Sequence, residues 1–254
     1  HQFVTYCHRF DLKHMPGMTF KLHNPYQETL NNPCIIVCNH QSMLDPMFFM
    51  ALHHKILIVA NQHSSYNPLI KMLFKWLGVY TIRDTNFTAW KDSSLERDLD
   101  IFRDYVQRWY SIVVFAEGAR NPESSILKYH KGPFYLAEKL GLDILPVFLH
   151  GVNNIMSIGS FACYDGHVNM FIEKRITPND SLWGNNYAET TKLVHKYFVN
   201  KYDDLRKNLE TSEYFVPLVM DRYRYKGVEL MSIVNSNIKK NKAYIKGVER
   251  RQPN

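Results

Sequence analysis

Four short segments of the chain are apolar at almost every position, and they constrain the possible folds more than any other feature of the sequence. They are Cys34–Cys38, Ile56–Ala60, Ser111–Phe115 and Ile144–Leu149. A strand with one face in water alternates apolar and polar residues, whereas unbroken apolar runs of this length are typical of strands buried on both faces. The sequence therefore predicts a central sheet that is covered by other elements on both sides.

Segments with helical spacing separate these apolar runs. The clearest is Ser94–Tyr110, in which apolar residues recur at the period of an amphipathic helix. Further helices are predicted at Asp45–His53, Pro68–Leu77, Pro133–Gly141 and Tyr187–Leu209, and further strands at Met18–Leu22, Val79–Ile82 and Val168–Ile172. Strands that alternate with helices favour an α/β fold with a mainly parallel central sheet flanked by helices.

The positive charge of the chain is concentrated at its C-terminal end. The net charge is +7, and residues 222–254 contain nine Lys and Arg residues against Glu229 and Glu249, so the remainder is close to neutral. This change predicts one domain over residues 1–217, followed over residues 218–254 by a basic helical tail or a linker to a following domain. No nucleic-acid-binding motif accompanies the basic residues, so we expect no nucleic-acid partner.

The composition also limits membrane, metal and redox chemistry. No window of about 18 consecutive apolar residues exists, so any membrane contact should be peripheral. The segment Pro68–Leu77 could lie on a bilayer, or it could be an ordinary packed helix. Four Cys residues are too few for a disulfide framework, and the spacing of the 12 His residues matches no metal site, so we expect none.

The first polar motif, NHQSMLD at residues 39–45, follows the apolar run Cys34–Cys38. Ligands bind at the carboxyl ends of parallel strands, and His40 lies at such an end. On one continuous helix His40 and Asp45 would lie about 140° apart, so they meet only if His40 precedes a helix whose first turn holds Asp45. Asp45 would then fix the tautomer of the imidazole and leave one ring nitrogen able to accept a proton. Alternatively, Ser42-x-x-Asp45 is only a capping box, and His40 has no role.

The second polar motif, FAEGAR at residues 115–120, follows another apolar run. Gly118 permits a close approach of the backbone or a positive φ, and the guanidinium of Arg120 suits a phosphate or carboxylate. Glu117 could hold Arg120 or bind a substrate hydroxyl; the alternative is a turn with an exposed ion pair of little energetic value. Together the two motifs predict a site that deprotonates a hydroxyl on a substrate carrying a negative group.

These residues resemble the signatures of the glycerolipid acyltransferases, whose bacterial members include the lysophosphatidic acid acyltransferases. Asn39-His40-x-Ser42-x-x-Asp45 resembles the H-x4-D motif of the family, and FAEGAR resembles its F-P-E-G-T-R block. Three weaker blocks fall in the family order: Gly78–Arg83, Lys131-Gly132 and Leu145-Pro146-Val147. The resemblance covers roughly residues 20–185 and implies the glycerolipid-acyltransferase fold.

The resemblance implies transfer of a fatty acyl chain from acyl-CoA or acyl carrier protein to the hydroxyl of a lysolipid, with no other cofactor. His40 would be the general base, oriented by Asp45, and the hydroxyl would attack the thioester directly. The residues implied in substrate binding are Asn39, Ser42, Arg83, Glu117, Gly118, Arg120 and Lys131. A peripheral position on a membrane, at the cytoplasmic face of the inner membrane of a bacterium, is also implied.

Three positions depart from the family pattern and leave alternatives open. Ala116 and Ala119 replace the Pro and Thr of the third block, and Asn61 stands where members often carry Lys. Because these changes weaken an anion site, the acceptor could be an amino-acid lysolipid, or the chain could be a catalytically silent lipid-binding module. A hydrolase that uses His40 to activate water is a further alternative, although no G-x-S-x-G motif is present.

The tail carries a second resemblance. Residues 221–227, DRYRYKG, look like the segment that joins an acyltransferase to a methyltransferase domain in some large bacterial polypeptides that begin with a lipid-exporter-like membrane region. This resemblance implies that the chain is one domain of a larger polypeptide, through which it would be tethered to the membrane.

Overall fold

The strands of the computed structural model form one mainly parallel sheet. The structure describes residues 17–61, 72, 74, 77–82, 93–121, 125–156 and 166–211. Within these ranges the sheet has seven strands in the order β1-β7-β6-β2-β5-β3-β4. They are β1 (Met18–His23), β2 (Ile35–Cys38), β3 (Ile56–Asn61), β4 (Tyr80–Ile82), β5 (Ser111–Phe115), β6 (Ile144–His150) and β7 (Gly166–Ile172). Only β6 and β7 pair antiparallel among these strands, so the predicted α/β class is confirmed.

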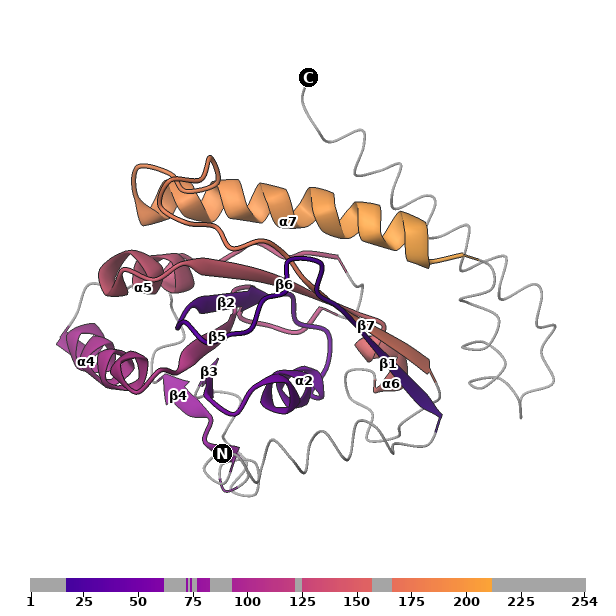
Figure 1. Ribbon diagram of the computed structural model, residues 1–254, viewed down its shortest axis with the longest axis horizontal. Helices are drawn as coiled ribbons and strands as arrows, with labels where there is room; N and C mark the ends of the chain where they lie inside the picture. The colour runs from indigo at the N-terminus through magenta and orange to yellow at the C-terminus, as the bar shows by residue number, and fades with distance from the viewer. Residues whose placement is uncertain are drawn as a thin grey trace.

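Helices cover both faces of this sheet (Figure 1). They are α2 (Asp45–Leu52), α4 (Ser93–Gln107), α5 (Gly132–Leu140), α6 (Val152–Ile155) and α7 (Tyr187–Leu209). Buried side chains of α2 and α6 pack against one face, and those of α4, α5 and α7 pack against the other. Both cores are therefore built on the same strands.

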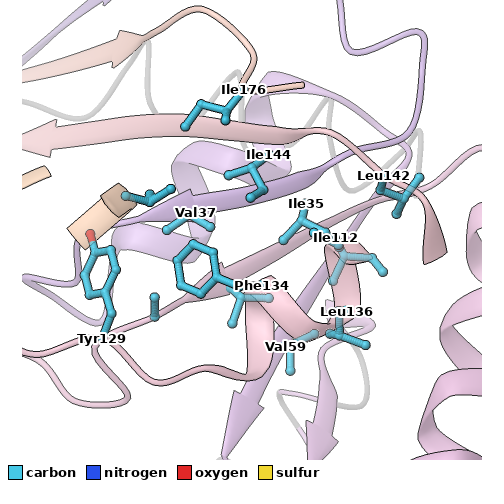
Figure 2. Packing of buried hydrophobic residues seen from close by; sticks show 14 of the residues in the cluster. Ile35, Val37, Val59, Ile112, Tyr129, Phe134, Leu136, Leu142, Ile144 and Ile176 are labelled. Carbon is cyan, nitrogen blue, oxygen red and sulfur yellow. The ribbon is translucent and has the colours of Figure 1, made fainter. Parts of the chain in front are cut away.

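The central strand β2 explains why the apolar runs lack alternation. All four of its residues are buried, and successive side chains point to opposite faces. Ile36 and Cys38 join the core beneath α2, whereas Ile35 and Val37 join the core beneath α5 and α7. Figure 2 shows Ile35 and Val37 among the side chains of this second core. Complete burial of such a side chain stabilises the fold by roughly 1.5–3 kcal/mol.

Differences from the predicted elements are small and have local causes. The helix predicted to reach Tyr110 ends at Gln107, because Trp109 adopts a left-handed φ of 68°. The short α6 was not predicted; it follows Gly151, whose φ is 90°. Of the predicted helix Pro68–Leu77, only residues 72, 74 and 77 are described, and they are helical. The boundary at residue 217 and the basic tail lie outside the described residues.

The strand order places the two polar motifs side by side. β2 lies between β5 and β6, and Cys38 at its carboxyl end is in register with Phe115 and Val147. The turns that follow β2 and β5 therefore begin at the same edge of the sheet. Among the described helices, none is long and apolar enough to cross a membrane.

Candidate active site

The turn after β2 brings His40 and Asp45 into contact. His40 lies between the end of β2 and the start of α2, whose first residue is Asp45. The Nδ1 atom of His40 is 2.7 Å from Oδ2 of Asp45. The carboxylate is fully buried, whereas the imidazole side chain is 18% exposed. The meeting of these two side chains across the turn, predicted from their spacing, is thus seen in the structure.

The Asp45 carboxylate also holds the backbone of the turn. Its Oδ2 atom accepts the backbone N–H groups of Gln41 at 2.6 Å and of Ser42 at 2.9 Å. Because the carboxylate accepts from Nδ1–H of His40 as well, the Nε2 atom keeps its lone pair and can accept a proton. One half of the Ser42-x-x-Asp45 capping box is present, because the backbone N–H of Ser42 donates to Asp45, whereas the hydroxyl of Ser42 donates to the carbonyl of Met156. The same carboxylate contacts His40, so the capping role and the contact with the imidazole occur together.

An aromatic ring fixes the plane of the imidazole. Phe115, the last residue of β5, stacks on His40 with ring centroids 4.2 Å apart and an interplanar angle of 21°. Phe49 of α2 packs against Phe115 in a T-shaped arrangement, with ring centroids 6.1 Å apart. The tautomer of His40 is therefore set by Asp45, and the direction of its Nε2 lone pair is set by Phe115. The sequence motif contains Phe115 but gave no signal of this role.

Glu117 connects the two turns. It is 4% exposed, and its two carboxylate oxygens accept the backbone N–H groups of His40 at 3.1 Å and of Leu127 at 2.9 Å. The exposed ion pair with Arg120 considered from the sequence is wrong, because the carboxylate is buried and bound to these amides. Glu117 thus positions the backbone of His40, and its contact with the acceptor stays a prediction.

Burial shifts the pKa of the Glu117 carboxyl upward, so its titration should affect the stability of the protein. Desolvation is the largest influence and raises the pKa of its carboxyl to about 7, against the opposing effect of the two backbone N–H groups. Its folded-state pKa thus exceeds the unfolded value of 4.5. Between these two pH values the folded protein holds a proton that the unfolded chain has released, so stability falls as pH rises through this window.

We expect the free energy of unfolding to fall by roughly 3 kcal/mol between pH 4.5 and pH 7 because of Glu117, since one pKa unit corresponds to about 1.4 kcal/mol. Urea unfolding of the wild type and of Glu117→Gln at pH 5 and pH 8 measures this contribution. The neutral amide should remove most of it and flatten the pH dependence. An identical pH dependence in the two proteins would contradict the assignment.

The turn after β5 requires a glycine. Gly118 has a φ of 68°, and a Cβ atom at this position would lie 2.8 Å from Nε2 of His130. The backbone N–H of His130 donates to the carbonyl of Ala116 at 2.8 Å, which holds the segment before α5 against the turn. His130 therefore lies over the motif FAEGAR. The sequence alone did not indicate this contact.

Two of the predicted cationic residues lie in these loops. Arg120 is partly exposed and makes no ion pair with any residue that the structure describes. Lys131 is exposed at the N-cap position of α5 and directly follows His130. Arg83 lies outside the described residues, so its position relative to the site stays a prediction. Neither Arg120 nor Lys131 forms an ion pair with a carboxylate that the structure describes.

Asn39 and Ser42 are buried and bind protein groups. The side-chain amide of Asn39 donates to the carbonyl of Leu149 and accepts its N–H, both at 2.8 Å. The hydroxyl of Ser42 donates to the carbonyl of Met156 at 2.8 Å. Both side chains thus fasten the turn to β6 and α6, and their predicted contact with the acceptor stays a prediction. Within the described ranges, no three His, Cys, Asp or Glu side chains cluster as metal ligands.

A protein-family model with the description Acyltransferase matches residues 19–150, a stretch that includes both turns. The chain belongs to the acyltransferase family. The resemblance inferred from the motifs is therefore confirmed.

Relatives of this acyltransferase-family chain carry related names. It is 30% identical over 139 residues to the 1-acyl-sn-glycerol-3-phosphate acyltransferase beta of Homo sapiens, an alignment that covers 53% of this chain and 48% of the human protein. It is 28% identical over 147 residues to the chloroplastic 1-acyl-sn-glycerol-3-phosphate acyltransferase BAT2 of Brassica napus, covering 58% and 41%. The chain thus spans less than half the length of these two relatives.

A solved structure shares the fold of this family member. The crystal structure of the 1-acyl-sn-glycerophosphate (LPA) acyltransferase PlsC from Thermotoga maritima aligns with a TM-score of 0.64 and 18% sequence identity. The alignment covers 81% of this chain and 79% of the Thermotoga chain. At this sequence identity the likeness shows a shared fold.

Proposed function

We propose that the protein transfers a fatty acyl chain from an acyl thioester to the hydroxyl of a lysolipid, with His40 as general base. The observation that carries this proposal is the contact of His40 Nδ1 with the buried carboxylate of Asp45, which leaves Nε2 able to accept a proton. The names of the relatives, which are 1-acyl-sn-glycerol-3-phosphate acyltransferases, support this reaction class. The intact pair of side chains favours an enzyme over a silent lipid-binding module.

The proposed reaction needs no covalent enzyme intermediate. Nε2 of His40 takes the proton of the lysolipid hydroxyl while the hydroxyl oxygen attacks the thioester carbonyl carbon. The tetrahedral intermediate collapses, the C–S bond breaks, and the thiolate leaves with the proton that the imidazolium returns. Asp45 stabilises the imidazolium between these two steps because its negative charge lies 2.7 Å away.

We propose that the acceptor carries a negative head group bound by Arg120 and Lys131. These two cations lie beside residues 39–45, the turn that carries His40 and Asp45 and is called the catalytic turn below. A second support is that Arg120 makes no ion pair with any carboxylate that the structure describes. A lysophosphatidic acid fits this arrangement. An amino-acid lysolipid is the second candidate, and Ala119 favours it because its methyl side chain offers no hydroxyl to a phosphate.

We propose acyl-CoA or acyl carrier protein as the donor and the cytoplasmic face of the inner membrane as the location of the reaction. The exposed Met43, three residues after His40, supports an approach of acyl chains to the turn from an apolar surface. Membership in a larger exporter, acyltransferase and methyltransferase polypeptide stays part of this proposal.

A mass-spectrometric transfer assay on the full chain tests the acceptor. Each donor is offered with lysophosphatidic acid, an amino-acid lysolipid and a lysolipid without net charge. We expect Arg120→Ala to raise KM for the preferred anionic acceptor by about 10- to 100-fold. This increase corresponds to the free energy that one hydrogen bond to a charged group contributes to binding. Arg108→Ala is the matched control, since Arg108 is exposed at the opposite edge of the sheet and pairs with Asp104.

The outcomes separate the candidates. Product only from lysophosphatidic acid supports the phosphate acceptor, and product only from the amino-acid lysolipid supports the second candidate. An unchanged KM in Arg120→Ala would contradict the anion site. Absence of product with every pair, in the presence of folded protein, would favour the silent module, and release of free fatty acid without an acceptor would favour the hydrolase.

A further inference from the structure

A residue far away in the sequence holds the catalytic turn. Gln41, between His40 and Ser42, is 2% exposed, and its side-chain Nε2 donates a hydrogen bond to the hydroxyl of Tyr202. The two residues are 161 positions apart, and Tyr202 is a fully buried residue of α7. The backbone N–H of the same Gln41 donates to Asp45 Oδ2 at 2.6 Å. One residue thus joins the α7 helix to the carboxylate that orients His40.

The hydroxyl of Tyr202 has a fixed position because its ring is packed in the core. The ring stacks on Phe148 of β6 with an interplanar angle of 7° and centroids 6.1 Å apart. Phe148 in turn packs against Phe198, one turn earlier on α7, at 4.4 Å. The anchor offered to Gln41 therefore cannot follow the turn if the turn moves.

The end of α7 is itself fastened to the edge of the sheet where the turn lies. Arg206 donates to both carboxylate oxygens of Glu210, at 2.9 and 3.1 Å. The Oε1 atom of Glu210 lies 3.2 Å from Nε2 of His150, the last residue of β6. The side chains of Arg206, Glu210 and His150 are each at most 8% exposed. These buried contacts join the end of α7 to β6, to which Asn39 also binds.

We propose that Tyr202 is a positioning residue for the acyl transfer proposed above, acting through Gln41 on the backbone of the catalytic turn. The hydrogen bond between them fixes the Gln41 peptide group, and that group donates to the oxygen of Asp45 that also binds His40. Within the described residues, Oε1 of Gln41 has no hydrogen-bond partner, so the side chain is held through Nε2 alone. The inference rests on the proposed function, because it assigns His40 as the base.

Loss of this bond should change the rate more than the binding of substrate. Gln41 would keep its place in the chain but lose its anchor, and the N–H groups that hold Asp45 would shift with it. A misplacement of about 1 Å at a reacting group lowers rates by as much as 100-fold. Because neither side chain lies among the cations proposed for the head group, KM should change little.

The test compares Tyr202→Phe with Tyr197→Phe in the transfer assay on the full chain. Both variants remove one hydroxyl from α7, and Tyr197 donates to Glu173 at 3.4 Å, away from the catalytic turn. We expect Tyr202→Phe to lower kcat by about 5- to 30-fold with KM within twofold, in line with a small displacement of the base. Tyr197→Phe should keep kcat within about twofold. Equal kcat values in the two variants would overturn the inference.

A second variant removes the same bond from the other side. Gln41→Met has a side chain of similar length and no amide, and it should lower kcat as Tyr202→Phe does. The double variant should be no slower than either single one, because both changes break one interaction. Additive losses of kcat in variants that circular dichroism shows to be folded would overturn the proposal.

Two further readouts exclude a merely structural role and a failure of the proposed function. The NMR signal of the His40 Nδ1 proton should shift in Tyr202→Phe and Gln41→Met but not in Tyr197→Phe; an unmoved signal counts against positioning. If His40→Ala retains full transfer, the proposed function fails. If His40→Ala is inactive and Tyr202→Phe equals Tyr197→Phe, the function stands and only the inference fails.

Discussion

Replacement of His40 by alanine should lower the rate of acyl transfer by about 10²- to 10⁴-fold, the contribution of a positioned general base. The variant keeps the cations proposed to bind the head group and the backbone of the turn, and it is assayed with the same thioester donor. It loses the Nε2 atom that accepts the hydroxyl proton. Folding should be little affected, since Asp45 keeps the N–H groups of Gln41 and Ser42 as donors.

The effect of His40→Ala is measured as product formed per enzyme in the mass-spectrometric assay, with circular dichroism as the check of folding. His167→Ala is the matched control, because His167 is an exposed residue of β7 outside the site. Transfer above about one tenth of the wild-type rate in a folded His40→Ala protein is incompatible with a general base of the usual strength.

Asp45→Asn should produce the second large loss. The amide is nearly the same size as the carboxylate but carries no charge to stabilise the imidazolium that forms when His40 takes the hydroxyl proton. The three donors of the turn all bind one oxygen, Oδ2, and the other carboxylate oxygen is buried without a hydrogen-bond partner among the described residues, so an NH2 group in its place would also be left unpaired. In the serine protease triad, the equivalent change lowers kcat by about 10⁴-fold. We expect a loss of about 10²- to 10⁴-fold here because the imidazolium loses its counter-charge.

The control for Asp45→Asn is Asp100→Asn, an exposed carboxylate of α4 that pairs only with Arg103 among the described residues. Kinetic constants and urea unfolding are measured for both variants. A large fall in kcat in Asp45→Asn with KM nearly unchanged assigns the carboxylate to the orientation and charge of His40. If the two variants had equal kcat values, Asp45 would have only the structural role of holding the turn.

The sequence predicted the strands well because their burial on both faces leaves a direct signature. The runs at Cys34–Cys38 and Ser111–Phe115 became β2 and β5 within one residue of their predicted bounds. Helix ends were less predictable. Residues Arg108–Tyr110 fit the helical pattern of α4, and only the left-handed φ of Trp109 ends it. The four-residue α6 is too short to produce a periodic signal.

The contacts of the candidate site were predictable where they are local. His40 and Asp45 are five residues apart, so spacing and helix geometry were enough to expect their contact. The partners of Glu117 were not predictable, since one of them is the backbone N–H of His40, 77 residues away. Backbone amides carry no residue-specific signal, and a hydrogen bond to one leaves no trace in a single sequence.

No pattern in the sequence indicated that Tyr202 contacts the catalytic turn. It lies on the apolar face of α7, where a tyrosine is indistinguishable from an ordinary core residue. Its hydroxyl matters only because the fold brings the end of α7 to the turn after β2. The sequence thus indicated the reacting groups of the site, while the groups that hold them came from the tertiary structure.

The position of α7 near the C-terminal end of the described chain has a consequence for the order in which the site is completed during synthesis. Both motifs and the whole match to the family model are complete by residue 150, yet α7 starts only at residue 187. A chain still on the ribosome, or a shortened one cut at the family boundary, would carry both motifs and the whole region that matches the family model. It would lack α7, which covers the second core together with α4 and α5. During synthesis, both motifs are therefore complete before the helix that holds the catalytic turn has been made.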